Sequence, residues 1–337
     1  MKIRWSKEHY HLEDGKVHWW DYELKGADVA SFAPLNHIWA RDSKRIYTQN
    51  SANKLADRKT FQVLNHIFAK DKNRVFYLSG WIKEADVNTF RVLDEGRFCD
   101  DESSSGKVSE DAWDYSGFAC DATQVFHDDM LEGKPVVLRG ADPKTFRSLQ
   151  FGFGKDSDAV FHGRWKLKKV NPQTFRVLNR SFSTDGKRAY YFDQEIASAD
   201  AASFEVLGEY WARDAKRIYF QKDTVPQADR ATFELIDYNF GRDRKYVYGY
   251  AGEILAGADA KSFQRIKSRR SSLFYRDKRR VYYQGKPVGG ADPKSFEVGP
   301  GYNEGRDHAW LYVETAKTEP RAGAGRKKKD SSALPPH

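Results

Sequence analysis

The chain has 337 residues and a net charge of +9, and 39% of its residues are hydrophobic and 15% aromatic. The aromatic content excludes wholesale disorder, and no run approaches the roughly 18 apolar residues of a membrane helix. Residues 1–10 contain no apolar segment typical of a secretory signal, so we expect a globular, cytoplasmic protein that does not associate with membranes.

An internal repeat dominates the chain. The motif Ala-Asp-x-x-Ser/Thr-Phe, with small substitutions, occurs in nine copies, most of them 29 or 30 residues apart. Its phenylalanines are Phe32, Phe61, Phe90, Phe146, Phe175, Phe204, Phe233, Phe263 and Phe296. The interval of 56 residues between Phe90 and Phe146 is close to two periods and indicates a degenerate or interrupted copy. A fixed period of this length is typical of stacked supersecondary units.

Residues 67–83 illustrate the strands expected in each copy. Residues 67–70 predict a short strand, and the turn at 71–73 follows because Asp and Asn side chains bond their own backbone. The β-branched and aromatic residues 74–78 predict a second strand, and residues 81–83 a third after a tight turn.

The Ala-Asp motif predicts a helical turn. Asp142 is a suitable N-cap and Pro143 fits the first helical position. The helical segment lasts about one turn, since strand composition resumes at residues 90–93 and no long amphipathic run follows.

Most aspartates are therefore expected to be structural rather than catalytic. The predicted caps are Asp28, Asp57, Asp86, Asp142, Asp200, Asp229, Asp259 and Asp292. The predicted turn residues are Asp42, Asp71, Asp214, Asp243 and Asp277. Catalysis needs one asymmetric constellation, so a residue that recurs in every copy is first explained by structure.

The repeat predicts a mainly β fold of tandem units of about 29 residues, each with short antiparallel strands and one helical turn. One unit is too small to fold alone, so neighbours should share a core. The expected core residues are the cap phenylalanine, the Val/Ile of the central strand and the Val-Leu that follows. We favour an open, curved, solenoid-like β-array, and the alternative is a closed, propeller-like ring.

The domain organisation follows from breaks in the repeat. We expect N-terminal repeats at 1–99, an acidic interruption at 100–120, C-terminal repeats at 121–315 and a disordered basic tail at 316–337. The tail could be a basic arm that contacts nucleic acid or a solubilising extension. We favour the solubilising extension, and we do not expect nucleic-acid binding.

The interruption is the candidate partner-binding segment. Residues 100–115 carry six acidic residues against one lysine, and departures from a repeat often form loops on the binding face. The candidate contact residues are Asp100, Asp101, Glu102, Glu110, Asp111, Trp113, Asp114 and Tyr115. Such a segment suits a basic cleft on a partner protein, and the alternative is a solvated insertion. Cys99 and Cys120 flank it, either as a disulfide in an oxidising compartment or as free thiols.

Other chemistry rests on weaker patterns. The repeated tyrosines Tyr47, Tyr77, Tyr190, Tyr219, Tyr248 and Tyr282 could pack in the core or form an exposed stacking face for a glycan or envelope polymer. An enzyme would have to use non-repeated residues, namely His9, His11, His127, His162 and the pair Asp128-Asp129. No metal-binding, phosphate-binding or nucleophile motif is present, so we predict no catalytic residue, metal or cofactor.

The repeated units resemble the DKNYY family. The namesake motif stands at residues 71–77, 185–191 and 277–283, and a companion Gly-Lys and Ala-Asp-Pro-Lys-Ser-Phe phrase stands at 285–296. The resemblance extends over about residues 13–313. It implies a bacterial repeat protein with no family catalytic residues. It also implies a similarity to proteins encoded beside polymorphic toxins, so we expect a monomeric immunity protein that binds a cognate toxin.

Overall fold

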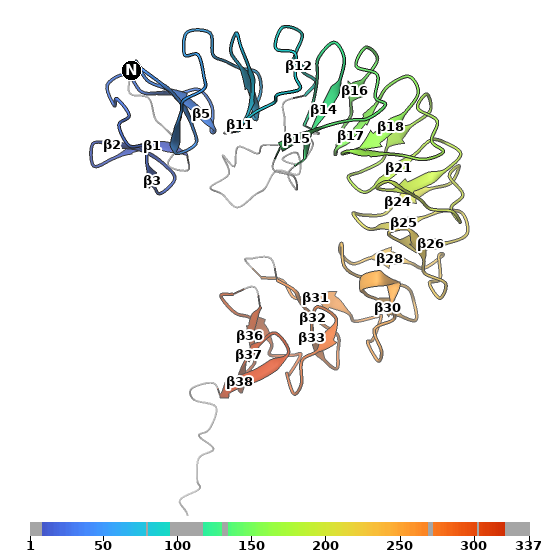
Figure 1. Cartoon of the computed structure of the whole chain (residues 1–337). Helices are drawn as coiled ribbons and strands as arrows, with labels where there is room; N and C mark the ends of the chain where they lie inside the picture. The colour runs from blue at the N-terminus through green and yellow to red at the C-terminus, as the bar shows by residue number, and fades with distance from the viewer. Residues whose placement is uncertain are drawn as a thin grey trace, which may run out of the picture. The chain divides into compact units, whose positions relative to one another are not determined.

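The computed structural model describes residues 9–78, 80–94, 117–129, 134–268, 272–301 and 303–320. The chain divides into two compact parts, Met1–Ala202 and Ser203–His337. Within each part, small antiparallel sheets follow one another in chain order (Figure 1). No helix among these residues is long and apolar enough to cross a membrane.

The N-terminal part contains six sheets in its described ranges. The first has three strands, β1 (Tyr10–Glu13), β2 (Lys16–Trp19) and β3 (Tyr22–Glu23). Five four-stranded sheets follow: β4 (Ala33–Pro34), β5 (Trp39–Arg41), β6 (Ile46–Thr48) and β7 (Ser51–Asn53); β8 (Gln62–Val63), β9 (Phe68–Lys70), β10 (Val75–Tyr77) and β11 (Gly80–Trp81); β12 (Arg91–Val92), β13 (Phe118–Cys120), β14 (Val125–Asp129) and β15 (Lys134–Val137); β16 (Arg147–Ser148), β17 (Phe153–Lys155), β18 (Val160–His162) and β19 (Trp165–Lys166); β20 (Arg176–Val177), β21 (Phe182–Thr184), β22 (Ala189–Tyr191) and β23 (Gln194–Glu195).

The C-terminal part contains four sheets in its described ranges. They are β24 (Glu205–Val206), β25 (Trp211–Arg213), β26 (Ile218–Phe220) and β27 (Asp223–Thr224); β28 (Glu234–Leu235), β29 (Gly241–Arg242) and β30 (Val247–Tyr248); β31 (Gln264–Arg265), β32 (Phe274–Arg276), β33 (Val281–Tyr283) and β34 (Lys286–Pro287); β35 (Glu297–Val298), β36 (Glu304–Arg306), β37 (Trp310–Val313) and β38 (Ala316–Pro320). In the three-stranded sheet, the 3₁₀ segment η2 (Tyr250–Gly252) follows β30, and Tyr248 forms a single bridge with Ile254.

Each sheet is a simple meander in which neighbours in sequence are neighbours in space. In the sheet β8–β11, Val63 pairs with Ala69, Phe76 pairs with Ala69 on the other side, and Tyr77 pairs with Gly80. The first and third turns of a meander lie at one end of the sheet, and the second turn lies at the other. These tandem antiparallel sheets confirm the predicted mainly β repeat.

The cap motif forms a single turn rather than a helix. The carbonyl oxygen of Asp86 accepts hydrogen bonds from the amides of Thr89 and Phe90, at 3.3 and 2.9 Å. The next two residues, Arg91 and Val92, already pair with β13, so the turn cannot propagate. The described residues accordingly contain no α-helix.

The cores lie between consecutive sheets. One cluster joins Trp39, Phe68, Phe76, Phe90 and Phe126, which come from three successive sheets and the cap turn between two of them. The cap phenylalanines are mostly buried and the Val/Ile positions of the central strands are fully buried, as the repeat predicted. The Val-Leu positions are only half-buried, because the Val ends the short first strand and the Leu follows it at the border of the core.

The cap phenylalanine packs on a small residue of the second strand. A Cβ atom added to Gly154 would lie 2.5 Å from Cζ of Phe146, and one added to Gly241 would lie 2.2 Å from Cζ of Phe233. Alanine occupies the equivalent position in β9 as Ala69, which is fully buried. The second strand of these sheets therefore keeps a small residue beneath the aromatic ring, whereas in the sheet β31–β34 the position holds Tyr275, whose ring stacks on that of Phe263.

Two predicted boundaries need correction. Residues 118–120, placed in the interruption from sequence, form the regular strand β13, because they pair with β12 across the inserted segment. Ala316–Pro320, placed in the disordered tail, form strand β38 and pair with β37. The remaining tail, residues 321–337, lies outside the described residues.

Candidate functional site

The aspartate that opens the second turn of each sheet is a buried structural anchor. Asp243 is 4% exposed. Its Oδ1 accepts hydrogen bonds from the amides of Lys245 and Tyr246, both at 2.7 Å, and its Oδ2 accepts from the Asp229 amide at 2.9 Å and the Tyr248 hydroxyl at 2.7 Å. One carboxylate thus joins the turn, the preceding cap motif and the third strand.

The same bonding recurs through the chain. Each carboxylate of the following residues also accepts four hydrogen bonds, from two turn amides, one cap-motif amide and one tyrosine hydroxyl: Asp42, Asp185, Asp277 and Asp307. Burial alone would raise the pKa of Asp243, but the hydrogen bonds hold it below the ordinary aspartate value. The predicted turn role of Asp42, Asp71, Asp214, Asp243 and Asp277 is confirmed, and Asp185 and Asp307 have the same role.

The repeated tyrosines are inside the protein. Tyr47, Tyr77 and Tyr219 are 1%, 6% and 0% exposed. Burial raises the pKa of Tyr47 to about 12, and the neighbouring Asp42 carboxylate adds to the rise. Buried rings cannot stack on a polymer, so the repeated tyrosines do not form the exposed aromatic face that a glycan-binding protein would need.

The interrupted repeat is the one place in the N-terminal part where the described chain departs strongly from the period. Between Phe90 and Phe146 the described residues form a single sheet, β12–β15, so the long interval reflects one interrupted copy. The inserted residues 95–116 lie between its first two strands. They include all eight candidate contact residues, Asp100, Asp101, Glu102, Glu110, Asp111, Trp113, Asp114 and Tyr115, which therefore lie outside the described residues.

An ordinary repeat shows how this turn is normally closed. In the sheet β8–β11, Oδ1 of Asn65 accepts hydrogen bonds from the amides of Ile67 and Phe68, at 3.0 and 2.8 Å. The Leu64 amide donates to the Phe68 carbonyl at 2.9 Å. A single residue, His66, separates Asn65 from Ile67.

The base of the insertion keeps the same hydrogen bonds. Asp94 replaces the asparagine, and its carboxylate accepts from the amides of Gly117 and Phe118, both at 3.1 Å. The Leu93 amide donates to the Phe118 carbonyl at 2.9 Å. Residues 95–116 therefore take the place of one residue, His66 in the preceding repeat, and leave the ends of the turn in their ordinary geometry.

The base is also tied to its neighbours. The side-chain amide of Asn36 donates to the Asn65 carbonyl at 3.3 Å, and that of Asn65 donates to the Asp94 carbonyl at 2.9 Å. From the following sheet, the Ser148 hydroxyl donates to the Asp94 carboxylate at 2.6 Å. A line of polar side chains thus anchors the insertion to the repeats on both sides.

A second extension leaves the same end of the sheet. The hairpin β14–β15 is longer than the corresponding hairpins of the other N-terminal sheets, with pairing out to Asp129 and Lys134. The third turn of a meander lies beside the first. Asp128 is buried at its root, where its carboxylate accepts a hydrogen bond from the Tyr77 hydroxyl and its amide donates to the Gly117 carbonyl at 2.8 Å. The insertion and the extended hairpin β14–β15 therefore share one base.

The candidate histidines occupy separate structural positions. His127 is buried with its ring 4.9 Å from that of Phe118, and His162 lies 4.4 Å from the ring of Phe153. Successive residues of a strand point to opposite faces, so Asp128 does not share a face with His127. His9 and His11 belong to the first sheet region.

Cys120 is a buried free thiol on β13, and burial raises its pKa. Cys99 lies outside the described residues. A cavity of about 680 Å³ lies elsewhere, between β31 and β35. Two of its guanidinium groups already bind acceptors of the protein, since Arg265 donates to the Ser272 carbonyl and Arg306 to the Glu297 carboxylate.

Asp94 was missed from sequence because its two amide partners lie 23 and 24 residues away. A signal was present, since an Asn or Asp follows the first strand in several repeats, as in Asn36, Asn65 and Asn179. The spacing between a cap aspartate and the next turn aspartate is also informative. It is 14 residues for Asp57 and Asp71 but 35 across the interruption.

Comparison with known proteins agrees with the repeat motif. Two overlapping matches to the model of the DKNYY family cover residues 39–223 and 211–286. No curated protein and no solved structure matches the chain. Because the family matches span most of the chain and coincide with the tandem sheets, the chain belongs to the DKNYY family.

Proposed function

We propose that this protein is a non-enzymatic immunity protein that binds and neutralises a cognate bacterial toxin in the cytoplasm. The observation that carries the proposal is the acidic segment 95–116, inserted at a turn whose hydrogen bonds are otherwise those of an ordinary repeat. Recognition segments are commonly presented in this way, on loops positioned by a rigid scaffold.

The chemistry of the segment favours a basic partner surface. Its acidic residues contrast with a chain whose net charge is +9. Complementary charges accelerate encounter and suppress wrong partners, and aromatic residues such as Trp113 and Tyr115 are frequent binding hot spots. A basic active-site cleft, as in a nuclease or a nucleotide-using toxin, fits this description.

Excision of the segment tests the proposal. Replacement of residues 95–116 by a single histidine would recreate the sequence pattern Asn65-His66-Ile67 at Asp94 and Gly117. We expect this variant to keep its circular dichroism spectrum and to lose binding to the toxin domain encoded by the adjacent gene, measured by calorimetry. A folded variant that binds and protects as well as the full chain would contradict the proposal, as would a toxin domain that the full chain does not bind.

Charge reversal tests the role of the acidic residues themselves. Replacement of Asp100, Asp101 and Glu102 by lysine should lower the association rate and flatten its dependence on ionic strength, because steering acts on encounter. The matched control reverses three exposed acidic residues far from the insertion in sequence, Asp193, Asp223 and Glu319. Equal association rates at low salt for all variants would remove residues 100–102 from the contact.

A further inference from the structure

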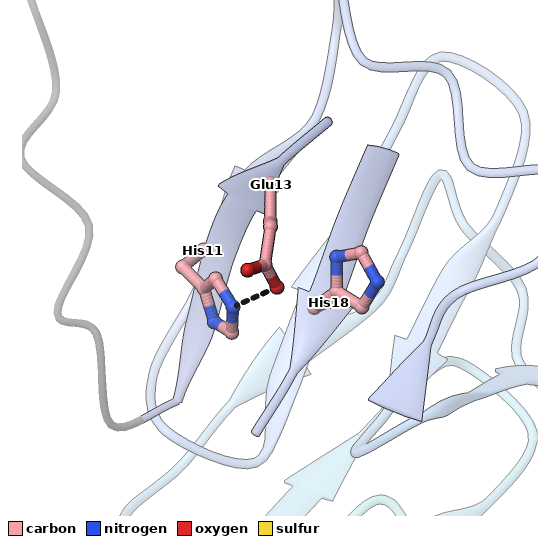
Figure 2. Close-up of side chains that lie close together, drawn as sticks. All are labelled: His11, Glu13 and His18. Atoms are coloured by element: carbon pink, nitrogen blue, oxygen red, sulfur yellow. Dashed lines mark ion pairs between the residues drawn. The ribbon is translucent and has the colours of Figure 1, made fainter. Parts of the chain in front are cut away.

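We propose that the first sheet holds a divalent transition metal, Zn²⁺, through His11, Glu13 and His18. The three side chains come from the hairpin β1–β2 and converge on one place (Figure 2). Imidazole and carboxylate groups are the ligands of catalytic and other open zinc sites, in which three protein ligands are completed by water. This site is independent of the acidic insertion.

Strand register brings the ligands together. His11 pairs directly with His18 across the hairpin. Glu13 lies two residues beyond His11, so its side chain leaves the same face of the sheet. Tyr10 and Val17 alternate with these residues and are buried in the core on the opposite face. The two histidines therefore lie on the face opposite this core, where both are half-buried and Glu13 is exposed.

The separations suit a single ion. One ligand atom from each residue lies within 4.8 Å of the others, and the two imidazole rings stack 5.5 Å apart with an angle of 22° between their planes. Zinc bonds of about 2.0–2.2 Å place ligand atoms roughly 3.4 Å from one another. Rotation of the Glu13 side chain can shorten the distances between the ligand atoms to this value, because Glu13 is largely exposed.

The surroundings of His11 determine which of its imidazole nitrogens is available to bind the metal. Nδ1 of His11 lies 3.4 Å from the His9 carbonyl oxygen, so a proton there would be donated to that carbonyl. This arrangement leaves Nε2, which is 3.7 Å from Oε2 of Glu13, as the ligand atom (Figure 2). Metal-ligating histidines usually donate their other N–H to a carbonyl or carboxylate in this way.

His18 supplies the second observation. Its Nδ1 is buried and has no hydrogen-bond partner in the part of the chain that the structure describes. Buried polar atoms normally have a hydrogen-bond partner, so this nitrogen requires either a hydrogen-bond partner or a metal ion. Glu23 pairs with His18 on the other side, but its carboxylate is bound by Nζ of Lys16 at 2.8 Å and is not counted as a ligand.

Zinc titration of the full chain tests the site. The metal-free protein, prepared with a chelator, is titrated with ZnCl₂ in a calorimeter. We expect the unmodified chain to bind one zinc ion. The double replacement His11→Gln and His18→Gln should reduce the zinc affinity by more than about tenfold, because loss of an outer-shell partner alone typically costs that much. Glu13→Gln, at an exposed position, should weaken zinc binding while leaving the circular dichroism spectrum unchanged.

The matched control is His308→Gln. His308 also lies beside a carboxylate, with Nδ1 3.4 Å from Oδ2 of Asp292, but it belongs to no three-ligand group among the described residues. Its replacement should leave zinc affinity and stoichiometry unchanged. Absence of zinc binding by the full chain, or equal binding by the double variant, would overturn the proposal.

Discussion

Single aspartates hold the turns of this protein together through acceptor geometry rather than charge pairing. At Asp243 both carboxylate oxygens accept two hydrogen bonds each, three of them from backbone amides. Unsatisfied buried donors are costly, so the side chain must present two acceptor oxygens at this position. Sequence alone identifies such residues as turn formers, whereas the link to a cap amide 14 residues earlier depends on the path of the chain.

Replacement of Asp243 by asparagine should therefore be strongly destabilising. The new amide NH₂ group would face donors in place of an acceptor oxygen, and we expect the free energy of unfolding to fall by about 2–4 kcal/mol. Urea unfolding of the variant measures this loss. Asp223→Asn, at an exposed site, should change stability by less than about 0.5 kcal/mol. Equal effects of the two substitutions would contradict the anchoring role.

The same carboxylates predict sensitivity to acid. Burial raises the pKa of Asp307, but hydrogen bonds from the Asp292, Ala309 and Trp310 amides and the Tyr312 hydroxyl hold it at about 2. An unfolded aspartate titrates near 3.9. Because the folded pKa is the lower one, the stabilisation is present above about pH 4 and is lost as the pH falls toward 2.

Urea unfolding between pH 7 and pH 2 measures this loss. Asp307→Asn removes the titrating group, so its stability should fall less steeply in acid than that of the unmodified chain. Parallel pH profiles for the two proteins would show that Asp307 does not contribute to the acid sensitivity.

At the scale of elements, the insertion is an addition to a complete turn. Its ends are held by Asp94 as an ordinary turn is held by Asn65. Closing a long loop costs more entropy than closing a short one, so replacing residues 95–116 by one histidine should raise the free energy of unfolding by about 1–2 kcal/mol. Chemical denaturation measures the change. A loss of stability would show that the segment packs against the sheet.

The small residue of the second strand is the other element-level constraint. A Cβ at position 154 would meet the Phe146 ring at 2.5 Å, so Gly154→Ala should destabilise by about 1–3 kcal/mol through overpacking. Gly289→Ala is the control, because no atom lies within 4 Å of the Cβ that it adds. Similar melting temperatures for both variants would mean that the Phe146 ring moves away from the added methyl group without a loss of stability.

Much of the architecture was predictable because it depends on local chemistry. The turn aspartates, the cap phenylalanines and the strands between them follow from residue type and spacing. Pairings that depend on register or on long excursions were missed. Asp94 is one example, and His18 is another, although the Asp14-Gly15 dipeptide, with φ of 49° and 73°, is a strong hairpin signal that places His11 opposite His18.

At the scale of the whole molecule, tandem sheets that share cores only with their neighbours should lose stability locally. The contacts of Asp243 lie within Ser203–His337, and Tyr248 and Val247 belong to clusters confined to that part. Amide hydrogen exchange of the Asp243→Asn variant should therefore rise at residues 229–283 and stay unchanged at residues 9–78. Exchange that rises equally along the chain would require one cooperative unit, in which a broken turn in a single repeat lowers the stability of every other repeat.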